Sequence, residues 1–374
     1  MKVGIMTFHS SHNCGSMLQA YALQHTLEER YGADAELINF ANQGSRNLYG
    51  MIDFRPKKQA IHNTFNNFKH YKLMKKYHQD YIDFMNEYLK VSKKRYLAEK
   101  QLYGCEKGYD LLVSGGDQVW NVKCPDADKA YYLSFAKDVR KVSFSPSFGG
   151  NNINETGVDL AMYRQYLAEY EKISVREPNG QKWLKELTGK DYPIIADPVF
   201  LLTHEEWLRQ FPLPEIKEKY IFNYAFFHNR PEANKALQQI SKKTGMPIYV
   251  LDIKSWAVYH LDEYGIKPFC MTGPRAFISL MQNAELALVQ SFHGTVFAAM
   301  FHKQFWSYRA PSIKKITDDR ATAILDQLGL RHRYVVIDEL PKMDYMEKID
   351  YSKTDERIER LRKEAFEYLD SFMK

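Results

Sequence analysis

The stretch KVGIMT at residues 2–7, followed by the loop FHSSHNCGS at residues 8–16, decides the fold of this chain. The short apolar run predicts a strand, and the Ser-, Asn- and Gly-rich segment after it predicts a loop. From Met17 apolar residues recur close to helical spacing up to Gly32, and AELINF at 35–40 predicts a second strand. A strand, a helix and a strand in such quick succession indicate a parallel sheet with helices on its faces.

The same alternation of strands and helices resumes after an interruption at residues 41–100. Further strands are predicted at 109–113, 141–145, 172–175, 193–196, 219–225, 247–251, 286–289 and 304–308. Further helices are predicted at about 157–170, after Arg176-Glu177-Pro178, after Gly273-Pro274, after Gln290, at 317–328 and at 353–374. The fold class predicted from this pattern is α/β, with two Rossmann-like domains.

A Pro-interrupted stretch at residues 211–215 marks the predicted domain boundary. Residues 1–210 are expected to form the N-terminal domain, on the acceptor side of the site. Residues 211–352 are expected to form the C-terminal domain, on the donor side. The charged helix at 353–374 is expected to pack back on the first domain.

Residues 45–100 are interpreted as a helical insertion in the first domain. Within 54–100 there are 12 Lys and Arg against 4 Asp and Glu, a surplus of 8 that exceeds the net +6 of the whole chain. A solvated helical hairpin explains such a basic face. The alternative is a docking surface for a phosphate-bearing glycolipid or for an anionic bilayer, which would give the protein a peripheral membrane contact.

Composition narrows the class of protein. The 374 residues are 45% hydrophobic and 26% charged, which is typical of a globular protein, and a net charge of +6 is too small for a dedicated nucleic-acid binder. Four scattered cysteines without a CxxC pair are typical of reduced thiols, and they predict neither a disulfide framework nor a zinc site. With no secretory signal and no long apolar run, we expect a cytoplasmic protein.

The strongest chemical signal is Ser291-Phe292-His293-Gly294-Thr295, where a buried strand runs into a helix. A helix start attracts phosphate or carboxylate, Gly294 lets a ligand approach the backbone, and His293 can transfer a proton near neutral pH. The alternative for His293 is a core histidine bonded to the backbone, and spacing alone does not separate the two.

Two more strand ends carry polar residues. Arg176 follows the strand 172–175 and suits a carboxylate or phosphate, although a structural pair with Glu177 is the simpler explanation. The turn Ser114-Gly115-Gly116-Asp117-Gln118 would let Asp117 accept a hydrogen bond from a sugar hydroxyl or help to deprotonate it.

The first loop places His9 and His12 three residues apart, followed by Asn13. No carboxylate lies beside these histidines, so a metal site is not expected. The loop is interpreted either as part of a polar acceptor pocket or as ordinary surface. The GxGxxG, Walker, HExxH and GxSxG motifs are all missing from the sequence, which weakens nicotinamide, kinase, zincin and serine-hydrolase assignments.

The chain resembles the polysaccharide pyruvyl transferase family at these residues. The resemblance lies in stretches that occur in family order, and they are 13–24 (NCGSMLQAYALQ), 112–121 (LVSGGDQVWN), 173–177 (ISVRE), 196–198 (ADP), Gly273-Pro274 and 291–297 (SFHGTVF). Some members carry Arg-Leu-His where this chain has Ser291-Phe292-His293.

The resemblance implies a fold similar to two-domain GT-B glycosyltransferases, with a cleft between Rossmann-like halves. It implies transfer of a pyruvyl group from phosphoenolpyruvate to two hydroxyls of a cell-surface polysaccharide precursor, forming a cyclic ketal and releasing phosphate. By the family pattern, His293 matches the catalytic histidine and Arg176 a donor-binding arginine. No cofactor or metal is implied, because phosphoenolpyruvate is a co-substrate.

The remaining site residues are assigned by their place in these motifs. Ser291, Phe292, Gly294 and Thr295 are expected on the donor side, and Asn13, Gln19, Gly116, Asp117 and Gln118 on the acceptor side, where a glycan or a lipid-linked oligosaccharide would bind. Two other functions stay open, a GT-B nucleotide-sugar glycosyltransferase and a non-catalytic glycan-binding relative. A nucleic-acid partner is not expected.

Overall fold

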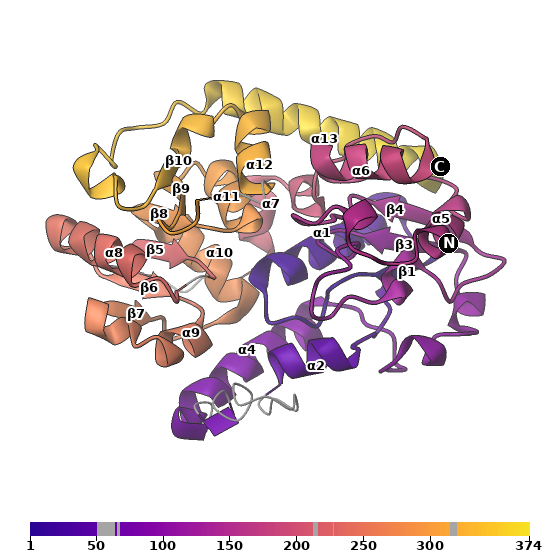
Figure 1. Ribbon diagram of the computed structural model, residues 1–374, viewed down its shortest axis with the longest axis horizontal. Helices are drawn as coiled ribbons and strands as arrows, with labels where there is room; N and C mark the ends of the chain where they lie inside the picture. The colour runs from indigo at the N-terminus through magenta and orange to yellow at the C-terminus, as the bar shows by residue number, and fades with distance from the viewer. Residues whose placement is uncertain (51–63, 66–67, 212–215, 227, 315–319) are drawn as a thin grey trace. The chain divides into compact units, whose positions relative to one another are not determined.

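The computed structural model describes residues 1–50, 64–65, 68–211, 216–226, 228–314 and 320–374 (Figure 1). The chain divides into two compact units. Unit 1 comprises Met1–Gly50, Asp83–Leu202 and Arg360–Lys374, and unit 2 comprises Met51–Ile82 and Thr203–Glu359. The boundary predicted from the sequence lies at residue 210 instead, and the predicted domain limits stay predictions.

Unit 1 is built on a parallel sheet in the order β2-β1-β3-β4. Its strands are β1 (Lys2–Met6), β2 (Asp34–Leu37), β3 (Leu111–Gly115) and β4 (Arg140–Phe144). Its helices are α1 (Cys14–Tyr31), α2 (Gln43–Tyr49), α5 (Leu160–Ala168) and α6 (Pro178–Thr188). The strands predicted at 172–175 and 193–196 are reduced to single bridges, Val142 with Lys172 and Val175 with Ile194, which extend the same parallel order.

Helix α1 begins and ends where its sequence specifies. The side chain of Asn13 caps the helix, because its Oδ1 accepts hydrogen bonds from the backbone N–H groups of Gly15 (3.0 Å) and Ser16 (3.3 Å). Gly32 ends it in the left-handed conformation, with φ of 59°. Apart from its last turn α1 is almost wholly buried, and it packs against the 3₁₀ helix η5 (Pro198–Leu201).

The core of unit 1 is rich in aromatic side chains. Trp120 stacks on Tyr132 with ring centroids 5.1 Å apart and meets Phe148 edge-on at 5.6 Å. The indole N–H of Trp120 donates to Ser114 Oγ at 3.0 Å, which satisfies its polar group inside the core. The aromatic residue after the Gly-Gly turn therefore packs that turn onto the sheet.

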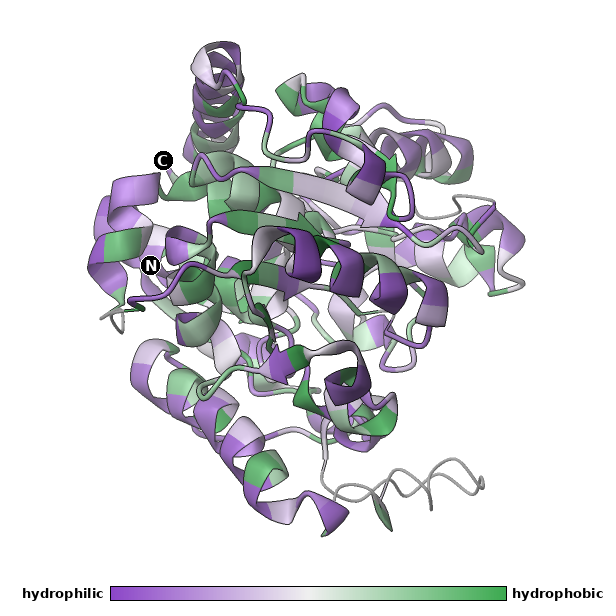
Figure 2. Cartoon of the chain, turned by 90° about the vertical axis from the view of Figure 1, so that its left-hand side faces the viewer, coloured by the Kyte–Doolittle hydropathy of each residue, from purple (hydrophilic) through white to green (hydrophobic). Residues whose placement is uncertain are grey.

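Unit 2 is built on a longer parallel sheet in the order β10-β9-β8-β5-β6-β7. Its strands are β5 (Ile221–Tyr224), β6 (Ile248–Val250), β7 (Ile266–Pro268), β8 (Leu286–Val289), β9 (Phe305–Arg309) and β10 (Tyr334–Val336). Its helices are α7 (His204–Gln210), α8 (Pro231–Thr244), α9 (Ile253–Val258), α10 (Gly273–Asn283), α11 (Phe292–Met300) and α12 (Arg320–Leu328). The central strands are fully buried, and Figure 2 shows green, hydrophobic residues gathered on strands and purple residues on the outer helices.

Two helices contribute residues to both units. Helix α4 (Tyr71–Tyr88) lies within the predicted insertion, and its Asp80 accepts hydrogen bonds from the backbone N–H and the hydroxyl of Thr272, each at 2.8 Å. The end of α13 (Ser352–Met373) contacts the rest of unit 1, where Arg362 Nε donates to the carbonyl of Phe200 at 2.8 Å. Part of the range 45–100 lies outside the described residues, so the helical insertion stays a prediction.

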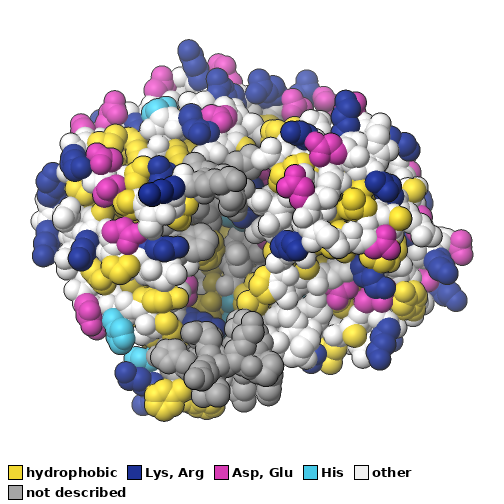
Figure 3. Space-filling model, in the orientation of Figure 1, with side chains coloured by type: hydrophobic (Ala, Val, Ile, Leu, Met, Phe, Trp, Pro, Cys, Tyr) yellow, Lys and Arg dark blue, Asp and Glu magenta, His cyan; other side chains and the backbone are white. Residues whose placement is uncertain are grey.

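The predicted fold class is confirmed, since both units are α/β with purely parallel sheets. Acidic and basic side chains are interspersed over the face shown in Figure 3, in keeping with the small net charge. Within the described stretches, every helix is too short or too polar to cross a membrane.

Substitutions at two glycines, Gly116 and Gly157, can distinguish the cost of a left-handed backbone from the cost of a steric clash. Gly116 (φ 65°) and Gly157 (φ 79°) both adopt the left-handed conformation, but only at Gly116 would a Cβ collide with a side chain, that of Gln19. We expect Gly157→Ala to lower the free energy of unfolding by about 1 kcal/mol, the cost of the conformation itself. Gly116→Ala should cost at least about 3 kcal/mol, because buried Gln19 would lose hydrogen bonds.

Urea denaturation of the two variants beside the unsubstituted protein measures this difference. Equal destabilisation by both substitutions would show that the Gln19 side chain can move away from the new Cβ without cost. The clash expected at Gly116 would then be absent.

Candidate functional site

The polar residues of unit 1 gather at one edge of its sheet. Strands β1, β3 and β4 are parallel neighbours, so the segments that follow them lie side by side at the carboxyl edge. Those segments are 7–13, 116–118 and 145–149. Ligands of open α/β sheets bind at this edge, so the geometry favours it as a binding site.

The turn after β3 directs Asp117 back over α1. Gly116 and Asp117 both have positive φ, 65° and 53°, a conformation that Asp tolerates better than most residues. The backbone N–H of Ser147 donates to the carbonyl of Asp117 at 2.7 Å and ties the turn to the loop after β4. The carboxylate Oδ2 of Asp117 accepts the hydroxyl hydrogen of Ser16 in the first turn of α1. Three segments distant in sequence therefore meet at Asp117.

Arg176 is buried in a cluster of carboxylates. Its Nε lies 2.6 Å from Glu177 Oε1 and its Nη1 2.6 Å from Asp197 Oδ2, and Nη1 is also 4.0 Å from Asp117 Oδ1. The Arg176–Glu177 pair that the sequence allowed is thus present, joined by Asp197 and Asp117. Asp197 also accepts from the backbone N–H of Val199 at 3.1 Å, which fixes the start of η5.

The carboxylates around Arg176 keep its guanidinium protonated. Burial alone would lower the pKa of its guanidinium, but the carboxylates of Glu177, Asp197 and Asp117 outweigh burial and raise it. The three acidic groups outnumber the guanidinium, so this cluster carries a negative excess. An anionic ligand would compete with Glu177 and Asp197 for Arg176, whereas hydroxyl groups can donate to the carboxylates.

Buried polar atoms line the same edge. His9 Nε2, Ser11 Oγ and Gln19 Oε1 have no hydrogen-bond partner among the described residues, although all three side chains are buried. Gln19 is held by its other end, because Nε2 donates to Thr7 Oγ1 and to the carbonyl of Ser16, each at 2.8 Å. Such groups are costly to leave unpaired, so they fit a polar ligand or ordered water.

His9 is a neutral imidazole in this setting. Burial lowers its pKa to about 4, against a smaller raising effect of its hydrogen bond to the carbonyl of Thr7. Its role at neutral pH is therefore that of a hydrogen-bonding group without charge. Among the residues that the structure describes, no three His, Cys, Asp or Glu side chains gather as metal ligands would.

Asp126 is a site residue that the sequence did not reveal. It is buried at the same edge, where burial, with a smaller contribution from the charge of Asp117, raises its pKa to about 6. Two interacting carboxylates in unlike surroundings are the usual arrangement for a general acid or base. Asp126 lies in the loop 122–128, whose sequence carries no motif, so only its burial identifies it.

Two of the predicted acceptor residues have structural contacts. Asn13 uses its side-chain oxygen to cap α1, as described above. Gln118 Oε1 accepts from Asn121 Nδ2 at 3.0 Å, close to Gly149, where a Cβ would collide with Gln118. Their positions at the carboxyl edge agree with an acceptor site, and their part in binding stays a prediction.

In unit 2 the predicted donor segment forms the junction of β8 and α11. Ser291 caps α11, because its Oγ accepts from the backbone N–H of Gly294 at 2.9 Å. Thr295 donates its hydroxyl hydrogen to the carbonyl of Ser291 at 2.9 Å and is fully buried. Gly294 is required for packing, since a Cβ there would lie 3.0 Å from Tyr224 Cδ1 and 3.1 Å from Val289 Cβ. These residues hold the helix start in place.

His293 lies in the first turn of α11 and is 6% exposed. Its ring meets that of Phe292 edge-on, with centroids 5.2 Å apart. The side chain is therefore largely enclosed at the carboxyl end of β8, next to the end of β5, where the backbone N–H of Gln290 donates to the carbonyl of Tyr224 at 3.0 Å.

The predicted site residues thus form two groups, one in each unit. In unit 1, direct contacts or close approach join Gln19, Gly116, Asp117 and Arg176, together with Ser16, which was not a predicted site residue. Ser291 to Thr295 form one helix start in unit 2. Each group lies at the carboxyl edge of its own parallel sheet.

Comparison with protein families identifies one match. Residues 13–309 match the family model of the polysaccharide pyruvyl transferases. The matched range includes Asp117, Arg176 and His293. The search of curated proteins found no match.

Several solved structures share the fold at low sequence identity. MnaA of S. aureus, solved with UDP, is 11% identical with a TM-score of 0.56, over 100% of this chain and 98% of that one. HepE of Anabaena, solved in complex with UDP, is 9% identical with a TM-score of 0.54, over 100% of both chains. These similarities confirm a GT-B-like fold and do not extend to activity.

The raised pKa of Asp126 predicts how stability depends on pH. The pKa is about 6 in the folded protein against 3.8 for an ordinary aspartate, so the folded chain holds a proton that the unfolded chain releases. This stabilising contribution is complete below about pH 4 and is lost as the pH rises through about 6, by at most about 3 kcal/mol.

Asp126→Asn should remove that loss, so that the variant gains stability over the unsubstituted protein between about pH 4 and pH 7. Thermal denaturation across this range measures the gain, with Asp191→Asn as a control at a side chain that is 71% exposed. An identical pH profile for Asp126→Asn and the unsubstituted protein would contradict the assignment.

Proposed function

The chain belongs to the polysaccharide pyruvyl transferase family, a family of transferases, and from that premise we propose that it moves a pyruvyl group from phosphoenolpyruvate to a glycan. The product is a cyclic ketal on two hydroxyls of a cell-surface polysaccharide precursor, and phosphate is released. The observation that carries the proposal is the family match over residues 13–309, which includes both groups of site residues.

Electrostatics distinguish the two groups in this proposal. The edge of unit 1 is acidic, with Asp117, Glu177 and Asp197 around one guanidinium, and it suits the hydroxyls of an acceptor sugar. The start of α11 carries the positive end of a helix dipole and suits the phosphate or carboxylate of phosphoenolpyruvate. Arg176 holds Asp117 in place and offers its charge to the donor in competition with Glu177 and Asp197.

The proposed chemistry needs two kinds of proton transfer. A proton added to the enol methylene makes the neighbouring carbon electrophilic, and we assign this proton to His293. A sugar hydroxyl then bonds to that carbon and gives up its proton, and a second hydroxyl displaces the phosphate with loss of another proton. Asp117 and Asp126 are the bases we propose for these losses, because they are the interacting carboxylates of the unit 1 edge.

A second candidate function is a glycosyltransferase that uses a nucleotide-sugar. The observation that favours it is the similarity to MnaA and HepE, both of which were solved with UDP. It predicts binding of UDP and turnover of UDP-sugars without phosphoenolpyruvate.

The proposed acceptor is a glycan that can be free or linked to a lipid. A lipid-linked oligosaccharide would bring the protein to the inner membrane face. Basic residues around exposed Phe68 and Tyr71, such as Lys69 and Lys72, would then meet its phosphates.

We expect phosphate release from phosphoenolpyruvate to depend on a pyruvylatable glycan and on His293. His293→Gln should lower the rate by about 10²–10⁴, the usual contribution of a proton-transferring side chain. His302→Gln, at an exposed histidine just beyond α11, is the matched control and should keep the full rate.

The assay follows phosphate with a panel of glycan and lipid-linked acceptors, and mass spectrometry detects the added pyruvyl group. Release that is equal in His293→Gln and the unsubstituted protein would refute the assigned role. Turnover of UDP-sugars in the absence of phosphoenolpyruvate would replace the proposed function with the second candidate.

A further inference from the structure

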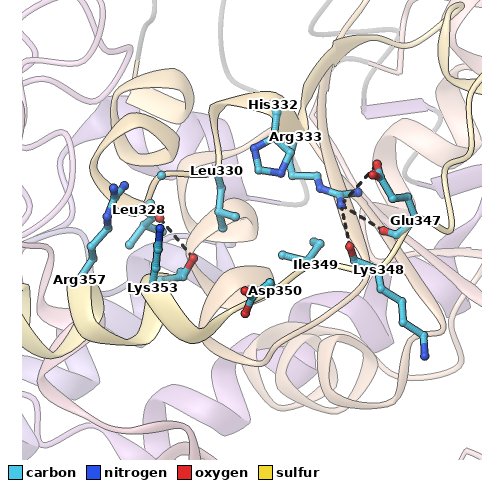
Figure 4. A pocket seen from close by; sticks show the side chains of 12 residues that line it. Leu328, Leu330, His332, Arg333, Glu347, Lys348, Ile349, Asp350, Lys353 and Arg357 are labelled. Atoms are coloured by element: carbon cyan, nitrogen blue, oxygen red, sulfur yellow. Dashed lines mark hydrogen bonds and ion pairs between the residues drawn. The ribbon is translucent and has the colours of Figure 1, made fainter.

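Unit 2 contains a pocket of about 250 Å³ that belongs to neither group of site residues (Figure 4). It lies where α12 ends, where the segment 329–333 leads into β10, and where α13 begins. Because β10 follows Arg333 directly, the pocket lies at the amino edge of the sheet. Ser291 follows β8 at the carboxyl edge, so the two sites are at opposite edges of the same parallel sheet.

Basic side chains dominate the lining of this pocket. Four permanently basic residues, Arg333, Lys348, Lys353 and Arg357, line it together with His332, against two acidic residues, Glu347 and Asp350. Figure 4 shows Lys353 and Arg357 side by side on α13 with their nitrogen atoms pointing the same way, whereas Lys348 points outward.

The two acidic residues are already engaged. Asp350 Oδ1 accepts from the backbone N–H of Ser352 at 3.0 Å. The Glu347 carboxylate is 3.9 Å from Arg333 Nη2, and its side chain is 67% exposed, so solvent screens much of its charge. Even with both carboxylates fully charged, the four permanently basic residues of the lining leave a positive excess.

Arg333 lines the pocket, and the charge of its guanidinium is only partly balanced by its neighbours. Its side chain is 2% exposed, with the guanidinium 4.6 Å from the ring centroid of Trp306. Nη2 donates to the carbonyls of Glu347 (3.1 Å) and Lys348 (3.4 Å), but Nε and Nη1 have no hydrogen-bond partner among the described residues. Burial lowers the pKa of Arg333, with Glu347 as the main opposing influence. A nearby anion would relieve this uncompensated charge.

Hydrogen bonds hold the residues that support the pocket, among them Trp306, which lies against Arg333. The indole N–H of Trp306 and the side-chain amide of Gln304 both donate to the carbonyl of Tyr345, at 3.0 and 2.9 Å. Gly329 (φ 74°) leaves room for Arg357, whose guanidinium a Cβ would strike.

We propose that this pocket binds a phosphate monoester or inorganic phosphate, with Lys353 and Arg357 in direct contact and Arg333 as the buried counter-charge. Its volume is below the ~300–1,000 Å³ of pockets for drug-sized ligands, so it suits a compact anion and not a nucleotide-sugar. Paired cationic side chains of this kind are the usual partners of phosphate oxygens. The inference does not rest on the proposed function.

Calorimetric titration of inorganic phosphate into the full chain tests this proposal. The double variant Lys353→Gln/Arg357→Gln should lose at least tenfold in phosphate affinity. Lys363→Gln, an exposed position on the same helix, should keep the affinity of the unsubstituted protein. Sodium chloride at matched ionic strength separates phosphate binding from a general salt effect.

Undiminished phosphate affinity in the double variant would overturn the proposal, as would failure of the unsubstituted protein to bind phosphate. Co-sedimentation with vesicles that contain phosphatidic acid, compared with vesicles of phosphatidylcholine alone, shows whether the phosphate group belongs to a lipid or to a soluble molecule. Sedimentation that needs Lys353 and Arg357 indicates a lipid headgroup, and binding of phosphate without sedimentation indicates a soluble ester.

Discussion

The buried ion cluster of Arg176 holds the candidate acceptor site together. A guanidinium that is almost wholly removed from water links Glu177, the adjacent residue, to Asp197 and reaches Asp117 on the turn after β3. Asp117 in turn accepts from Ser16 in the first turn of α1. Burying a cation without partners costs a prohibitive amount of free energy. Arg176 can therefore be buried only when Glu177, Asp197, Asp117 and Ser16, and the loops that carry them, are in place.

This cluster also explains why the unit 1 edge differs chemically from the helix start in unit 2. Carboxylates outnumber the cation around Arg176, whereas α11 begins with a capping serine, a glycine required for packing and a histidine. We therefore propose that hydroxyl groups bind at the edge of unit 1 and anions at the helix start of unit 2. The contrast comes from a few side chains at strand ends, while β3 and β8 are buried along their whole length.

The sequence predicted most of the regular elements because their signals are local. The helix predicted from Met17 to about Gly32 is present as α1, which begins earlier, at Cys14, because Asn13 caps it. The apolar runs of β3, β4 and β8 coincide with buried strands. The short strands β7 and β10 were missed, since three residues of ordinary composition carry no periodicity. Residues 172–175 and 193–196 have strand-like composition but make only single bridges.

The site was less predictable because its determinants are contacts between distant residues. Arg176 could be singled out by its place after an apolar run, but its engagement with Asp197 and Asp117 depends on the packing of η5 and the Gly116 turn. Asp126 carries no motif, and only its burial beside Asp117 raises its pKa. Likewise Arg333 and Arg357 gain significance from a pocket that the chain forms between elements without a sequence signature.

The most direct test of this account is the stability of Asp197→Asn, measured by urea denaturation at neutral pH. Removing one partner of a buried ion pair should cost about 3–5 kcal/mol. Glu171→Gln breaks the exposed pair with Arg140, whose side chain is 44% exposed, and should cost less than about 1 kcal/mol. A loss in Asp197→Asn as small as that in Glu171→Gln would contradict the central place given to the Arg176 cluster.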